Sequence, residues 1–91
     1  MRIEIRKYGD LLVSRPAGRE ALAAMVAYLP LRTGDEAIEL DFEGVLVVAP
    51  SWLEEVLHGL RERSGREVRC LPSSNSSLRQ SLEVLGEHLP R

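Results

Sequence analysis

Residues 37–51 read AIELDFEGVLVVAPS, and this stretch decides the fold. Over residues 37–42, Ala37 to Phe42, every second side chain is apolar, which is the period-two pattern of a half-buried strand. Residues 45–49 stay apolar after a glycine, so they form either a buried loop or a bent extension of that strand. The Pro-Ser pair at the end of the stretch then suits the first turn of a helix.

Three segments carry apolar residues at helical spacing and are bounded by residues that favour helix ends. They are residues 14–29, residues 50–65 and residues 77–89. Ser14 suits the N-cap of the first segment, and Gly65 suits the end of the second. At the start of the third segment, Ser77 with Gln80 fits a capping box best.

The remaining apolar runs predict strands. Residues 2–6 alternate apolar and charged side chains, residues 11–13 are apolar, and Gly9 between them indicates a hairpin turn. Residues 66–71 alternate again. The order ββαβαβα predicts an α/β fold with a single small mixed four-stranded sheet and three helices. The length predicts one domain over residues 1–91.

Composition narrows the classes of function. The 12 basic and 14 acidic residues give a net charge of −2 and are interspersed, so no stripe attracts nucleic acid or an anionic membrane. No apolar run approaches a membrane span, and the N-terminus lacks the apolar stretch of a signal peptide, so we expect a cytoplasmic protein. Cys70 is the only cysteine, and we expect it to be a buried small apolar residue.

The search for catalytic chemistry predicts that the chain is not an enzyme and holds no metal or cofactor. His58 and His88 lack metal-ligand spacing and are best interpreted as solvated. Asp41 lies near the carboxyl end of a strand, where α/β folds place ligands, but no second general acid or base accompanies it. A turn-stabilising or capping role for Asp41 is therefore favoured over hydrolase or transferase chemistry.

The start of the helix at residue 50 is the favoured interaction site. Ser51 falls in the first turn, where a phosphate would meet free N–H groups and the positive end of the helix dipole. Trp52 lies at the margin of the apolar stripe, and Gly59 follows seven residues later and leaves a notch. We expect a surface of Ser51, Trp52, Glu55 and Gly59 to bind a partner protein, although Trp52 can equally pack into the core from the margin.

An alternative function is a small-ligand sensor. Arg15 and Arg19 lie at a helix start, where guanidinium and backbone N–H groups can bind a nucleotide or another anion. Arginines at such positions are more often simply solvated.

Residues 40–45, followed four residues later by Pro50 and Ser51 and an apolar helix, resemble the central motif of STAS domains, the anti-sigma factor antagonist fold. In that family a strand ending in Leu-Asp and a Gly-Val pair precedes an Asp-Ser-Ser-Gly helix start. The resemblance places Ser51 at the position of the serine that partner kinases phosphorylate. Here Ala49 replaces the aspartate and Trp52 replaces the glycine.

The chain resembles the short STAS-like family of unknown function more closely. That family has a Ser-Arg-Pro segment before an alanine-rich helix, here residues 14–16, and later Leu-Asp-Phe-x-Gly-Val and a Pro-Ser pair. The resemblance implies a single STAS-like domain that binds another protein, an ATPase-fold kinase or an anti-sigma factor, with phosphorylation of Ser51 as a switch. An apolar face left uncovered in so small a domain can equally form a homodimer.

Overall fold

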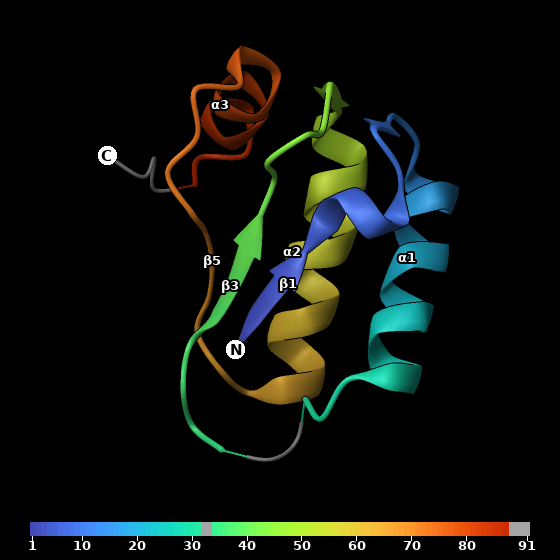
Figure 1. The fold of residues 1–91 in the computed structure, drawn as a ribbon, viewed down its shortest axis with the longest axis vertical. Helices are drawn as coiled ribbons and strands as arrows, with labels where there is room; N and C mark the ends of the chain where they lie inside the picture. Colours follow the sequence, from blue (N-terminus) through green and yellow to red (C-terminus); the bar gives the residue numbers. More distant parts are fainter. Residues whose placement is uncertain (32–33, 88–91) are drawn as a thin grey trace.

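The computed structural model describes residues 1–31 and 34–87 (Figure 1). Within these residues three α-helices and five short strands alternate along the chain. In order they are β1 (Arg2–Glu4), the 3-10 helix η1 (Ile5–Tyr8), β2 (Leu11–Leu12), α1 (Arg15–Tyr28), β3 (Ile38–Asp41), β4 (Val47–Val48), α2 (Pro50–Ser64), β5 (Val68–Cys70) and α3 (Ser76–Val84).

The strands form two sheets, and every pairing is parallel. One sheet has the order β1-β3-β5, and β2 pairs with β4 in a second. The predicted α/β class with three helices is confirmed, but the single mixed four-stranded sheet is wrong. The apolar residues 45–49 explain part of the difference. They contain β4, a separate strand that follows β3 in the chain and pairs with β2.

The predicted hairpin at the N-terminus is also wrong. Residues 5–8 form η1 instead of strand, and Ile5 is fully buried. Strands β1 and β2 therefore do not pair with each other. Instead β1 pairs in parallel with β3, and β2 pairs in parallel with β4. Gly9 does end the element, with a φ of 130° that favours glycine, and its N–H bonds to the carbonyl of Arg6. The turn signal was therefore correct, but the turn closes a 3-10 helix rather than a hairpin.

The three-stranded sheet has two unlike faces. Alternation places Ile38 and Leu40 of β3 beneath the helices, where both are fully buried. The opposite face carries charged side chains that pair across the strands, with Arg2 bonded to Asp41 and Arg69 to Glu39. We call this surface the charged sheet face. Its residues are Arg2, Glu4, Glu39, Asp41 and Arg69.

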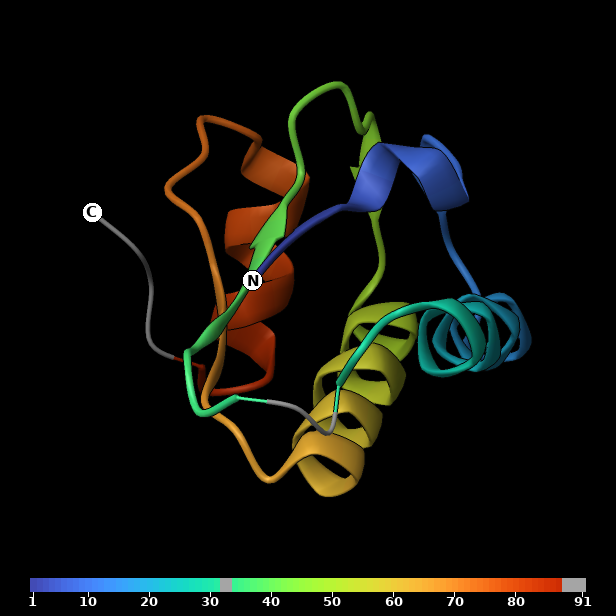
Figure 2. The same ribbon diagram turned by 60° about the horizontal axis from the view of Figure 1, so that its bottom comes forward.

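Helix α2 lies at the centre of the helical layer. It packs against α1 on one side, α3 on the other and β5 beneath (Figures 1 and 2). Its stripe of Leu53, Val56, Leu57 and Leu60 is buried as predicted. Gly65 ends the helix at a left-handed φ of 66°, also as predicted.

The caps of the other two helices have different outcomes. Ser14 caps α1 as predicted, since its hydroxyl accepts the N–H of Ala17 at 3.2 Å. The prediction that Ser77 caps α3 is wrong, because Asn75 caps this helix by accepting the N–H of Leu78 at 3.0 Å. The Ser77 hydroxyl is engaged elsewhere, with the backbone of Val48. The helix predicted to reach residue 89 ends at Val84, so its predicted end is wrong for residues 85–87, and residues 88 and 89 lie outside the described residues.

Candidate protein-interaction surface

The structure buries Trp52 and thereby contradicts its predicted place on a docking surface. Its side chain is 1% exposed, and its ring stands edge-on to Phe42 with centroids 6.4 Å apart. The physical reason is the central position of α2, because neighbours on three sides cover the margin of the stripe as well as its middle. Trp52 is a core residue.

The predicted notch at Gly59 is also closed. Leu22 of α1 fills it, and a Cβ added at Gly59 would collide with the ends of the Leu22 side chain. Gly18 of α1 makes the matching approach, since a Cβ there would lie 2.9 Å from the Trp52 carbonyl oxygen. These two glycines let α1 and α2 pack closely, and Gly59 is therefore a packing residue rather than part of an exposed surface.

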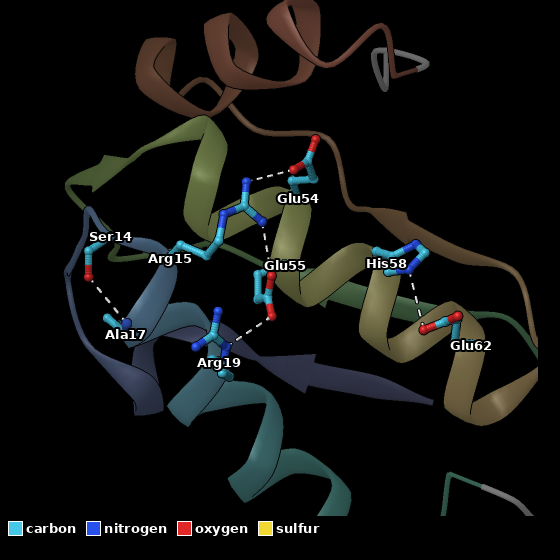
Figure 3. A network of polar contacts seen from close by, with 8 residues as sticks. All are labelled: Ser14, Arg15, Ala17, Arg19, Glu54, Glu55, His58 and Glu62. Carbon is cyan, nitrogen blue, oxygen red and sulfur yellow. Dashed lines mark hydrogen bonds and ion pairs between the residues drawn. The ribbon is translucent and has the colours of Figure 1, made fainter.

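Glu55 belongs to an ion-pair cluster between the N-terminal halves of α1 and α2 (Figure 3). Arg15 contacts Glu55 at 2.9 Å and Glu54 at 2.6 Å, and Arg19 contacts Glu55 at 3.5 Å. The hydrogen bond from Arg15, with a smaller contribution from Arg19, holds the pKa of Glu55 below its usual value. The carboxylates of α2 are thus neutralised by α1.

The same pairs bear on the alternative anion site. Arg15 is half-buried and gives both of its terminal nitrogens to glutamates, so an anion there would have to displace Glu54 or Glu55. Arg19 is exposed, and within the described part of the chain its one ion pair is the long contact with Glu55. The arrangement is a helix-to-helix clamp, and it disfavours Arg15 and Arg19 as an anion site.

Ser51 remains available at the start of α2. It is half-buried, and its hydroxyl has no hydrogen-bond partner among residues 1–31 and 34–87. Ala49 occupies the N-cap and provides no side-chain cap, so the first turn keeps backbone N–H groups without side-chain partners. Glu54 and Glu55 lie three and four residues later, on the same face of the helix as Ser51.

Exposed apolar side chains lie on and next to β2 and β4, and β4 shortly precedes the start of α2. The register pairs Leu11 with Val47 and Leu12 with Val48; the second pair is buried and the first faces outward. We call four large exposed apolar side chains on these strands and on the residues next to them the apolar patch. They are Leu11, Val13, Leu46 and Val47, with exposed fractions of 59%, 56%, 64% and 39%.

Side chains of the α3 region hold β4 in this position. The hydroxyls of Ser77 and Ser81 both donate to the Val48 carbonyl, and Ser77 also accepts the Val48 N–H at 2.9 Å. Asn75 donates to the Val45 carbonyl at 2.7 Å. Helix α3 and its N-cap thus fix the far edge of β4 and leave its outer face to solvent.

Sequence reasoning missed this patch. The runs at residues 11–13 and 45–49 are apolar without a clear period, which indicated burial. The only available signal for exposure was the short length of these two runs, because two-residue strands bury every second side chain and expose the rest.

Asp41 has the structural role that was predicted for it. Its carboxylate accepts the N–H of Glu43 at 3.0 Å and the Arg2 guanidinium at 2.6 Å, so it stabilises the turn after β3. Arg2 first, and then the Glu43 N–H, hold the pKa of Asp41 below its usual value. A pocket of about 510 Å³ lies beside it at the carboxyl ends of β3 and β5.

Cys70 and His58 match their predicted environments. Cys70 is buried, and burial raises the pKa of its thiol to about 12, so it is not a nucleophile at neutral pH. His58 is exposed on α2, 3.3 Å from Glu62 (Figure 3). His88 lies outside the described residues. Within the described part of the chain no three metal-ligating side chains gather, and no helix is long and apolar enough to cross a membrane.

Comparison with protein-family models, curated proteins and solved structures finds no match for this chain. The resemblance to STAS domains therefore stays a prediction from the motif at residues 40–51.

Proposed function

We propose that this chain is a non-catalytic regulatory module that binds another protein through the apolar patch, with Ser51 as the switch. The observation that carries the proposal is the patch itself. Four of the six large apolar side chains that are exposed in the described residues lie on or next to β2 and β4, whereas the other two, Tyr28 and Val84, lie on α1 and α3. Exposed apolar surface of this kind marks interaction sites in small soluble domains.

The position of Ser51 supports the switch. It follows β4 by three residues, so it is close along the chain to the β4 part of the patch. A phosphate on Ser51 would add nearly two negative charges at the N-terminus of α2, where the helix dipole and free N–H groups stabilise them. The folded state would therefore tolerate the modification while the surface beside the patch becomes strongly acidic.

The ion-pair cluster would respond to that phosphate. Ser51, Glu54 and Glu55 share one face of α2, so the phosphate would repel the two carboxylates and compete with them for Arg15. The guanidinium would then turn from the glutamates toward Ser51. This rearrangement is confined to the α1–α2 junction and explains how a modification there changes partner binding without unfolding the domain.

The STAS resemblance suggests the partner class, an ATPase-fold kinase or an anti-sigma factor. The test is affinity capture with the wild-type chain, followed by titration of the captured partner with Ser51→Asp and its matched control Ser51→Ala. We expect Ser51→Ala to bind like the wild type and Ser51→Asp to bind about tenfold more weakly or worse. Equal affinities for both variants would remove Ser51 from the proposal.

The alternative, a nucleotide or anion sensor at Arg15 and Arg19, has no supporting observation beyond the residues themselves. Thermal denaturation with a panel of nucleotides tests it, since a ligand of the folded state raises the melting temperature.

A further inference from the structure

The outer edge of β2 is the one sheet edge in the described residues that nothing protects. Natural proteins blunt strand edges with charged side chains or cover them with other elements. The outer edge of β1 carries Arg2 and Glu4, and Arg61 donates to the carbonyl of Val68 at the edge of β5. The α3 region covers β4. Strand β2 and the residue after it instead present exposed Leu11 and Val13.

The backbone of this edge is also unpaired. Strand β4 bonds to the carbonyls of Asp10 and Leu12, through Val47 and Ala49 at 3.1 and 2.7 Å. Because alternate residues of a strand point to opposite edges, the N–H and C=O groups of Leu11 and Val13 point away from β4. No other group among residues 1–31 and 34–87 bonds to them. Four strong hydrogen-bonding groups are therefore open to a further strand.

We infer that this edge pairs with the same edge of a second copy of the chain, antiparallel, with the two-fold axis at Leu12. In this register Leu11 of each copy lies opposite Val13 of the other. Two residues directly opposite in a hydrogen-bonded antiparallel pair exchange both of their bonds. Pairing about Leu12 therefore gives a hydrogen-bond partner to all four open N–H and C=O groups of each copy. A register shifted by one residue would pair none of these groups, and a register shifted by two residues would leave some of them unpaired.

Charge favours the same arrangement. Asp10 precedes the edge, and antiparallel pairing about Leu12 places it opposite Ser14 of the other copy, while parallel pairing would place Asp10 beside Asp10. The edge is thus self-complementary in hydrogen bonds and apolar side chains and avoids a like-charge pair, as a two-fold interface requires.

The dimer extends the small sheet sideways and leaves its outer face open, so it does not depend on the proposed partner. The contact is short, and we expect it to be concentration-dependent. Sedimentation equilibrium over a concentration series is the measurement. The wild type is expected to shift from the 10.2 kDa monomer toward twice that mass.

Two double variants test the register, and both alter only exposed side chains. Leu11→Lys with Val13→Lys places like charges opposite each other at both pairs and is expected to weaken self-association at least about tenfold. Leu11→Lys with Val13→Glu places opposite charges there and is expected to stay within a few-fold of the wild type. Circular dichroism confirms that both variants fold.

A wild type that stays monomeric at every soluble concentration would overturn the inference. So would a dimer that the two-lysine variant leaves unchanged, or one that both variants dissolve equally.

Discussion

The protein exposes two sheet faces, of which one is charged and the other is apolar. The charged sheet face pairs its own charges across the strands, Arg2 with Asp41 and Arg69 with Glu39. The face of the β2–β4 sheet bears the apolar patch instead. A face that satisfies its own groups gains little from a partner, whereas exposed apolar side chains gain from being covered. The comparison therefore supports the proposal that a partner binds at the smaller sheet.

The largest effect is expected inside the molecule, beneath both faces. Trp52→Ala removes a fully buried ring that contacts Phe42, so it should lower the free energy of unfolding by about 3–5 kcal/mol. Urea denaturation of the variant measures this loss. A variant nearly as stable as the wild type would mean that Trp52 is not part of the core, and the docking surface first predicted around it would return.

The next effect separates the two faces directly. Val47→Asp places a charge within the apolar patch and should weaken binding of a captured partner at least about tenfold, because truncated or charged anchors at interface centres carry such losses. Binding can be followed by surface plasmon resonance. The matched control is Glu39→Lys on the charged sheet face, which should bind as the wild type does. Equal losses of partner affinity for the two variants would contradict the distinction between the apolar patch and the charged sheet face.

A smaller effect concerns pH and the charged sheet face. The pKa of Asp41 is lowered in the folded state, so its pairing with Arg2 stabilises the protein above the usual aspartate value of 3.8 and is lost as the pH falls through the lower folded value. Asp41→Asn should cost less than about 1 kcal/mol at neutral pH, and the difference from the wild type should shrink below pH 3.8. Denaturant titrations at both pH values check this, and a difference that grows in acid would contradict the sign.

The smallest effect is expected from Arg69→Gln. The change breaks an exposed pair with Glu39 and should alter the free energy of unfolding by no more than about 0.5 kcal/mol. Thermal denaturation is sufficient to compare the two proteins. A large loss of unfolding free energy would show that the ion pairs of the charged sheet face hold the sheet together. That face would then stabilise the fold rather than only contact solvent.

The sequence predicted the long, periodic elements well. Helices α1 and α2 were found with Ser14 and Gly65 at their ends, since caps and an apolar stripe are local signals. The pairing of β2 with β4 was not predicted, because two-residue strands carry almost no period and these partners lie more than 30 residues apart. A turn glycine cannot distinguish a hairpin from the end of a 3-10 helix.

The candidate site shows the same limit. The helical wheel placed Trp52 and Gly59 at the margin of a stripe, but it could not show that Leu22 from another helix covers Gly59. The position of Ser51 in the first turn of α2 is confirmed because it follows from Pro50 and the local sequence. The apolar patch needed tertiary information, since apolar residues in a short chain are expected inside.

Site-specific photo-crosslinking tests the central claim that the apolar patch is the interaction surface. A photoreactive residue is placed at Leu46 in one chain and at Arg69 in another, and both are irradiated in the producing cells. The account predicts an adduct with a different protein from position 46, absent from position 69 and diminished by Ser51→Asp. An adduct from position 69 alone, or only a second copy of the chain captured at position 46, would contradict it.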